Sequence, residues 1–173
     1  MAPFCAINGD GPSDGACRIK ALPVILGIHE SGRSGEEKSE PMYIGGIMPD
    51  GRLREGYTTG SCAAAAVRAC LEWQIHGKKP EYVSIELPSG RRLTLPVIFD
   101  DDGSCGVIKD AGDDPDVTDG CMVKAWVRLD DQPGDIRFTA GEGIGTVTVP
   151  GLKLPVGEAA VNPVPRQMIS RQI

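Results

Sequence analysis

The most regular hydrophobic pattern lies in the middle of the chain, where apolar residues recur every four positions at Ala63, Val67, Leu71 and Ile75. Residues spaced in this way share one face of an α-helix, so the pattern predicts an amphipathic helix over residues 60–76. Thr58 or Thr59 can cap the first amides of this helix. Gly77, followed by two lysines and a proline, supplies the stop.

Beyond Pro80 the hydrophobic period changes to two, which is typical of half-buried β-strands. The predicted strands are residues 82–87 and 91–99, joined by Pro-Ser-Gly as a hairpin, then 106–109, 122–129 and 136–139, with a short strand near 146–149. One helix followed by neighbouring strands predicts an α+β fold, with a mixed or antiparallel sheet packed on one main helix. The Gly/Pro-rich run between Gly141 and Pro165 is otherwise expected to be loop.

Residues 1–50 show neither period and are interrupted by Gly-, Pro- and charge-rich clusters. Such a segment buries too little apolar surface to offset its ordering entropy, so we expect a disordered arm before a domain of residues 51–173. Sequence read through upstream of a natural start is the competing interpretation. The apolar run Ala21 to Ile28 is not expected to be a secretory signal, because Pro23 interrupts it and no small-residue cleavage site follows.

The charge balance narrows the classes of partner. The formal net charge of −6 argues against a nucleic-acid groove and against docking on anionic lipid, both of which need clustered Lys and Arg. The apolar run in the arm is also far shorter than the roughly 20 residues of a membrane span. Six cysteines without a Cys-x-x-Cys pair favour reduced thiols over a zinc site, so we expect a cytoplasmic protein.

Residues 54–66 form the first candidate site. Free amides at a helix start carry partial positive charge, and Gly60 allows close approach of a ligand, so this segment is a candidate anion cradle. The four alanines of Ala63–Ala66 would admit a flat ligand or a second structural element. The alternative is that the threonines only cap the helix and the alanines only permit tight packing.

Residues 107–120 form the second candidate site, with five aspartates within ten residues. Neighbouring carboxylates can raise one another's pKa or bind a cation, although the spacing does not match an EF-hand loop. The alternative is a loop of Asx turns in which the carboxylates accept bonds from their own backbone amides. Lys109 adjoins the cluster and can neutralise part of its charge.

A third candidate is the alternate-glycine run of Gly141, Gly143 and Gly145. Glycines can form a pocket wall made of backbone, as cofactor loops do, but a tight bend at a strand end explains them equally well. Their spacing departs from the dinucleotide-binding fingerprint.

Three stretches, taken in order, resemble a known family: Leu-Arg-x-Gly-Tyr-Thr-Thr-Gly-x-Cys-Ala-Ala-Ala-Ala, Lys-Asp-Ala-Gly-Asp-Asp-Pro-Asp-Val-Thr-Asp-Gly and Asn-Pro-Val-Pro-Arg-x-Met-Ile. They are similar to the cobalt-precorrin-5B (C1)-methyltransferases, the CbiD enzymes of anaerobic cobalamin synthesis. The likeness runs from about Leu53 to Ile173.

The resemblance implies methyl transfer from S-adenosylmethionine to carbon C1 of a cobalt-corrinoid precursor. It also implies that members are about twice this length, with a second, Gly-rich domain after the third stretch. The chain would then be the N-terminal half of the enzyme, active only with the missing C-terminal domain or as a homo-oligomer. The alternatives are a truncated fragment that binds a corrinoid or a cation without catalysis and, last, a plain calcium-binding domain.

On this reading each candidate site receives a role. The substrate carboxylates need donors, for which we expect Arg54, Thr58, Thr59, Gly60, Ser61, Cys62, Lys109 and Arg166. The polar, catalytic wall of the pocket is expected from Asp113, Asp114, Asp116 and Asp119. The glycines 141, 143 and 145 are the expected cofactor-binding residues, with no resident metal.

Overall fold

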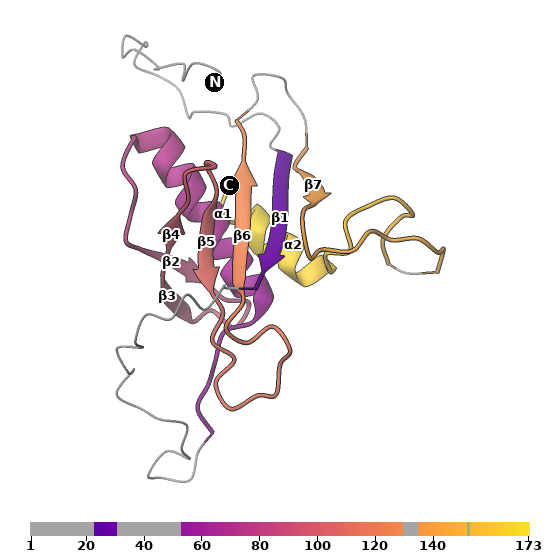
Figure 1. Ribbon diagram of the computed structural model, residues 1–173, viewed down its shortest axis with the longest axis horizontal. Helices are drawn as coiled ribbons and strands as arrows, with labels where there is room; N and C mark the ends of the chain where they lie inside the picture. The colour runs from indigo at the N-terminus through magenta and orange to yellow at the C-terminus, as the bar shows by residue number, and fades with distance from the viewer. Residues whose placement is uncertain (1–22, 31–52, 130–134, 152) are drawn as a thin grey trace.

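The computed structural model describes residues 23–30, 53–129, 135–151 and 153–173 (Figure 1). Its elements are β1 (Pro23–His29), α1 (Thr59–His76), β2 (Tyr82–Glu86), β3 (Arg92–Pro96), β4 (Ile98–Phe99), β5 (Cys105–Ile108), β6 (Met122–Val127), β7 (Arg137–Ala140) and α2 (Pro163–Ser170). The α+β class expected from the sequence is confirmed. No helix within the described ranges combines the length and the hydrophobicity that a membrane crossing requires.

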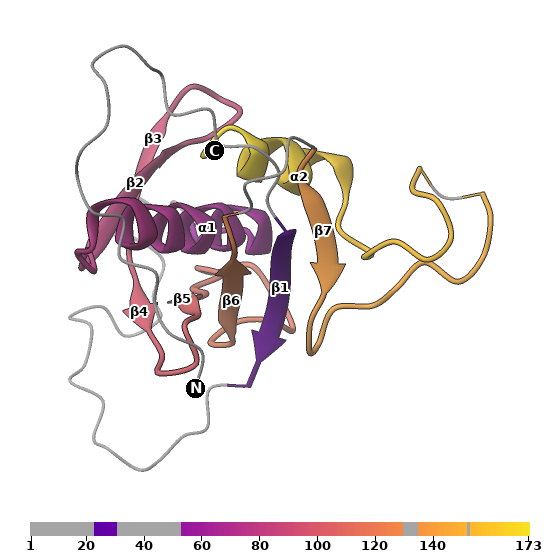
Figure 2. The same ribbon diagram turned by 90° about the horizontal axis from the view of Figure 1, so that it is seen from above.

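The main sheet has five strands in the order β4-β5-β6-β1-β7, and β2 pairs with β3 as a separate hairpin. β1 runs antiparallel to β6 and parallel to β7, which makes the sheet mixed. α1 lies along one face of this sheet, while α2 and the hairpin contact the helix from its other sides (Figure 2). The core is therefore centred on α1.

α1 agrees with the prediction except that it begins one residue earlier, at Thr59. The Thr58 hydroxyl accepts a bond from the Ser61 amide at 3.1 Å, and Gly77 closes the helix in the left-handed region with φ +70°. The residues Ala63–Ala66 are almost completely buried against the sheet and α2. Of the two roles open to the alanines, packing against a second element is the one that the structure displays.

The hairpin and the strands β5, β6 and β7 lie where the alternating pattern predicts them. Two expectations were wrong in detail. The strand predicted over 91–99 is divided at Val97 between the hairpin and the main sheet: the Val97 amide still donates to the Glu81 carbonyl at 3.0 Å, whereas Ile98 and Phe99 pair with β5. The strand predicted near 146–149 is reduced to a single bridge between Thr146 and Ala159.

Sequence reasoning missed two elements. Residues 23–29 of the arm that was expected to be disordered form β1, while 1–22 and 31–50 lie outside the described residues. α2 was also missed, although Asn162 precedes it and prolines occupy its first turn, where no amide needs an intrahelical partner. Met168 and Ile169 bury the apolar face of α2 against α1. The division at residue 50 remains a prediction.

Candidate functional site

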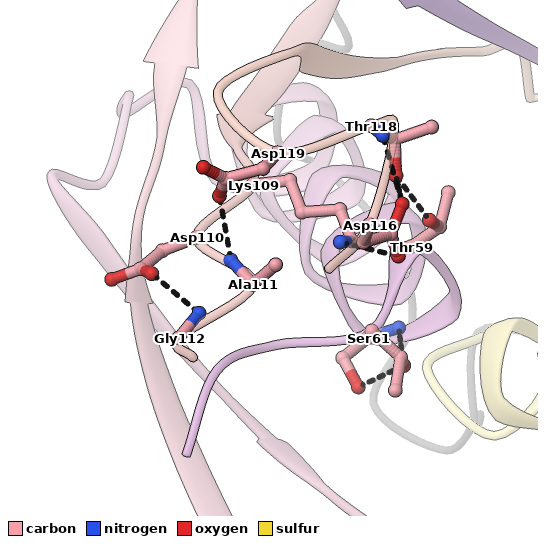
Figure 3. A network of polar contacts seen from close by, with 10 residues as sticks. Thr59, Ser61, Lys109, Asp110, Ala111, Gly112, Asp116, Thr118 and Asp119 are labelled. Atoms are coloured by element: carbon pink, nitrogen blue, oxygen red, sulfur yellow. Dashed lines mark hydrogen bonds and ion pairs between the residues drawn. The ribbon is translucent and has the colours of Figure 1, made fainter. Parts of the chain in front are cut away.

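The acidic segment forms a closed loop between β5 and β6 (Figure 3). Bonds between Lys109 and the segment 120–121 close its base, with the Lys109 amide donating to the Cys121 carbonyl at 2.9 Å. Inside the loop, carboxylates accept backbone amides: Asp110 from Gly112, Asp116 from Thr118 and Asp119 from Ala111, each at 2.8 Å. The first two are the contacts expected of Asx turns, and the third joins residues eight positions apart across the loop.

A second set of bonds ties this loop to the segment that precedes α1. The Tyr57 amide donates to the Asp110 carbonyl at 2.6 Å, and the Asp113 amide donates to the Arg54 carbonyl at 3.1 Å. The Arg54 guanidinium donates two hydrogen bonds to the Asp110 carboxylate, of 2.5 and 2.8 Å. The two sequence stretches are therefore joined by both backbone and side chains.

Two glycines make this close approach possible. A Cβ on Gly56 would lie 2.1 Å from the carbonyl carbon of Ala111, and one on Gly112 would lie 2.2 Å from the Arg54 carbonyl oxygen. Gly112 also has φ +68°, a region that favours glycine. Both positions therefore exclude larger residues for reasons of backbone packing.

Lys109 is the one charged residue among the largest fully buried side chains of the described residues, with its side chain 1% exposed. Its Nζ lies 2.8 Å from Asp116 Oδ2, and the same carboxylate accepts the Thr118 hydroxyl at 2.6 Å. The hydrogen bond from Lys109, followed by those from Thr118, holds the pKa of Asp116 well below its usual range. The Thr59 and Thr118 hydroxyls, 3.4 Å apart, connect this network to the start of α1 (Figure 3).

A cavity of about 760 Å³ opens where the helix start, the acidic loop and the first turn of α2 meet. It is lined by Leu53, Arg54, Glu55, Gly56, Tyr57, Thr58, Thr59, Gly60, Lys109, Ala111, Asp113, Asp114, Pro115, Asp116, Val164, Pro165 and Met168. Its carboxylates outnumber its cations, and both cations, Arg54 and Lys109, are already paired with aspartates. We call this space the main cavity.

The structure brings most of the predicted site residues together at this cavity. Those that line it are Arg54, Thr58, Thr59, Gly60, Lys109, Asp113, Asp114 and Asp116. The apolar part of the wall, which includes Tyr57, Pro165 and Met168, was not predicted. Pro165 and Met168 lie in the third family-like stretch, and this was the available signal.

Ser61, Cys62 and Asp119 were predicted for the site but do not line the main cavity. Ser61 and Cys62 are buried, and burial raises the pKa of the Cys62 thiol to about 12. That thiol is protonated at neutral pH and is a poor nucleophile. Asp119 points into the loop, where it accepts the Ala111 amide.

Arg166 also lies outside the main cavity. Its guanidinium donates to the Val161 carbonyl at 3.0 Å and to the Ala159 carbonyl at 2.9 Å, and it pairs with Glu158 at 2.7 Å. It also lies 4.9 Å from the centre of the Phe138 ring. These contacts fasten α2 to the preceding loop and to β7.

The glycine run lies beside a second cavity of about 300 Å³, which shares Thr59, Gly60 and Pro165 with the main one. Gly143 and Gly145 line this second cavity, and Gly141 does not. Backbone carbonyls of β1 occupy the space beside two of these glycines: a Cβ on Gly141 would lie 2.5 Å from Leu26 O, and one on Gly143 would lie 2.4 Å from Ile28 O. The described residues contain no group of three or more His, Cys, Asp or Glu placed to hold a metal ion.

Together, the fold and the site define an α+β domain with a ligand-sized cavity between the start of its main helix and an acidic loop. More particularly, the chain belongs to the CbiD family, whose model matches residues 48–173. It is 54% identical over 121 residues to a protein of Bradyrhizobium sp. (strain BTAi1) named cobalt-precorrin-5B C(1)-methyltransferase. A protein of the same name from Pseudomonas putida (strain W619) is 51% identical over 125 residues.

These matches cover 68% and 70% of this chain but 32% and 34% of the two relatives, so the chain spans about a third of their length. A solved structure is also similar: the cobalamin biosynthesis protein (cbiD) from Archaeoglobus fulgidus, with 32% identity and a TM-score of 0.54. That match covers 71% of this chain and 38% of the other.

The acidic loop is expected to make the stability of the protein depend on pH. The pKa values of Asp116 and Asp110 are held low by hydrogen bonds from Lys109 and Arg54 respectively. The unfolded chain, whose aspartates titrate near about pH 3.9, then takes up protons before the folded chain does. We expect this contribution to stability to be fully present above about pH 5 and to fall as the pH drops through 4 and below.

Urea unfolding at pH 7 and at pH 3.5 measures this loss. We expect Asp116→Asn to be less stable than the wild type at pH 7 and to lose less on acidification, because the group no longer titrates. Asp101→Asn, in the turn between β4 and β5, is the matched control and should retain the wild-type pH dependence. Equal acid sensitivity in wild type and Asp116→Asn would refute the assignment.

Proposed function

We propose that this chain is the substrate-holding part of an S-adenosylmethionine-dependent methyltransferase that acts on carbon C1 of cobalt-precorrin-5B in anaerobic cobalamin biosynthesis. The names of its relatives support the reaction class. The observation that carries the proposal is the convergence at the main cavity of all three family-like stretches, residues 53–60, 109–116 and 164–168. Segments so distant in sequence meet at one cavity lined by both apolar and polar groups, as ligand sites commonly are.

The cavity offers two kinds of surface to a flat, carboxylated macrocycle. Leu53, Tyr57 and Met168 provide apolar contact for its face. The amides of Thr59 and Gly60 are the first two of α1 and have no intrahelical acceptor, so they suit one substrate carboxylate. Arg54 and Lys109 would remain paired with aspartates. They would affect the substrate through their positive charge and through the shape of the cavity wall.

Methyl transfer from a sulfonium to an electron-rich ring carbon depends on alignment and on exclusion of water more than on a strong base. In our proposal Asp113 and Asp114 form the polar rim of the cavity, while Asp116 keeps Lys109 and the loop in place. Asp119 contributes by holding the Ala111 amide. The aspartates would thus position substrate, and none has to move a proton.

S-adenosylmethionine supplies the methyl group in this proposal. The glycine run is the cofactor-binding segment in this proposal, although β1 carbonyls lie against the Cβ side of Gly141 and Gly143. Gly145 differs, since a Cβ there would meet only the Ala160 Cβ, at 3.8 Å. Gly143 and Gly145 line the second cavity, so a methyl donor placed there could contact their backbone with β1 in place.

The test is isothermal titration of the chain with a carboxylated cobalt corrinoid and, separately, with S-adenosylhomocysteine. We expect the corrinoid to bind the wild type and Val164→Trp, which fills the cavity mouth from α2, to bind at least about tenfold more weakly, or about 1.4 kcal/mol. Val156→Trp is the matched control, because Val156 is equally exposed and lies outside the cavity lining.

Binding of both ligands would support a complete site, and binding of the corrinoid alone would support a substrate-holding part that needs its partner domain. Equal corrinoid affinity in the two tryptophan variants would place the ligand elsewhere. A folded wild type that binds neither ligand would favour the alternative of a non-catalytic fragment.

A further inference from the structure

β1 occupies the interior of the main sheet although it comes from outside the family-matched residues 48–173. It pairs with β6 along six residues, from Val24 opposite Val127 to His29 opposite Met122. On its other edge, residues 23–26 pair with β7. Without β1, the family-matched part of the chain would have a one-strand gap between β6 and β7.

The side chains of β1 fit this gap closely. Val24 and Leu26 are 0% and 3% exposed, and both belong to the hydrophobic core. Beyond β7 the chain continues to follow β1, since the Gly141 amide donates to the Leu26 carbonyl at 2.6 Å and the Ile28 amide donates to the Glu142 carbonyl at 2.8 Å. The slot therefore recognises an extended strand by backbone bonds on both edges and by two apolar side chains.

The glycines that follow β7 leave room for the backbone of β1. A side chain at Gly141 or Gly143 would collide with β1 carbonyls at 2.5 and 2.4 Å. Gly143 also has φ +73°, a region that favours glycine. Both the contact with β1 and the backbone conformation therefore require glycine at this position. In this structure the alternate-glycine run admits a peptide backbone.

We propose that the space between β6 and β7 is a strand-acceptor slot, that β1 is a separable donor strand, and that β1 of one copy of this chain can enter the slot of a second copy. Two observations support exchange between copies. The slot lies in the family-matched part and its occupant does not. The 23 residues 30–52 between β1 and Leu53 would span up to about 75 Å when extended, which is long enough to reach a neighbour.

Strand exchange would also affect the candidate site. Leu26 and Ile28 of β1 line the second cavity, whose residues Thr59, Gly60 and Pro165 are shared with the main cavity. The occupant of the slot therefore forms one wall of the space beside the proposed substrate site. A copy that receives β1 from its neighbour would have that wall built in trans.

A complementation experiment with two full-length variants tests the proposal. Leu26→Asp makes β1 a poor donor, because it would bury a charge, and leaves the slot open. Gly143→Val blocks the slot, because its Cβ would lie 2.4 Å from Ile28 O, and leaves an intact donor strand without a place. We expect each variant alone to sediment as a folded monomer and the mixture to form a heterodimer, with a twofold rise in mass.

Gly151→Val is the matched control partner, because Gly151 also has positive φ but a Cβ there meets nothing within 4 Å. Its own β1 stays in its own slot, so mixing it with Leu26→Asp should give no heterodimer. A fluorescent peptide of residues 21–30 should bind Leu26→Asp, and the same peptide carrying the aspartate should not. Loss of the α1 circular dichroism signal in Leu26→Asp, or failure of both heterodimer and peptide binding in folded samples, would overturn the proposal.

Discussion

Replacing Gly56 by alanine is expected to lower the free energy of unfolding by about 3 kcal/mol, at the upper end of the usual cost of overpacking. The added Cβ would lie 2.1 Å from the Ala111 carbonyl carbon and 2.4 Å from the Gly112 nitrogen. Both obstacles are backbone atoms held by hydrogen bonds, so no side chain can rotate away. Relief requires the acidic loop to separate from the segment before α1.

That separation would break the bond from the Tyr57 amide to the Asp110 carbonyl and the paired bonds between Arg54 and Asp113. The main cavity lies between these two segments, so we expect corrinoid affinity to fall together with stability. Urea unfolding followed by the fluorescence of the two tryptophans measures the first effect, and isothermal titration measures the second.

Gly145→Ala is the matched control for this substitution. Its added Cβ would meet only the Ala160 Cβ at 3.8 Å, which is an ordinary contact, and it should change stability by less than about 0.5 kcal/mol. If Gly56→Ala were as stable as Gly145→Ala, the close backbone approach between the two stretches would be wrong.

The parts of the fold that follow from local signals were predictable. α1 carries a four-residue apolar repeat, a threonine cap and a glycine stop, and each acts within a few residues of the others. The strands of the hairpin and β5 to β7 are likewise predicted by the alternation of apolar and polar residues. The division at Val97 depends instead on which sheet accepts the next residue, and this is a tertiary choice.

β1 was the main error because its stability is entirely non-local. The segment has a proline at its start and a glycine in its middle, which lower its intrinsic strand preference. It becomes a strand because β6 and β7 supply partners on both edges and the core covers Val24 and Leu26. Composition around it indicated disorder and carried no information about that slot.

The sequence predicted which residues belong to the candidate site better than it predicted how they are arranged. Arg54 and Lys109 were predicted to bind substrate carboxylates, with neutralisation of the acidic cluster as the other role of Lys109, and the structure pairs them with Asp110 and Asp116. Sequence proximity of acids and bases shows that pairing is possible without showing which partners meet across a loop. The apolar wall from α2 was missed because the helix itself was not predicted.

Replacing Arg166 by lysine is expected to cost about 2–3 kcal/mol of stability, since hydrogen bonds from a charged donor contribute roughly 1.5–3 kcal/mol. The guanidinium serves the carbonyls of Ala159 and Val161 and the Glu158 carboxylate at once, with its side chain 20% exposed. An ammonium keeps the charge but lacks the planar fork that reaches these acceptors together.

This variant also decides between the two roles considered for Arg166. If it clamps a substrate carboxylate, the lysine variant should unfold like the wild type and bind the corrinoid more weakly. If it fastens α2 to the 158–161 segment, thermal and urea unfolding should shift first, and affinity should follow only through Pro165 and Met168, the α2 residues in the cavity wall. Arg171→Lys, at the exposed end of the same helix, should shift stability by less than about 0.5 kcal/mol. The contacts favour the second role, because the guanidinium is committed to acceptors within its own chain and lies outside the main cavity.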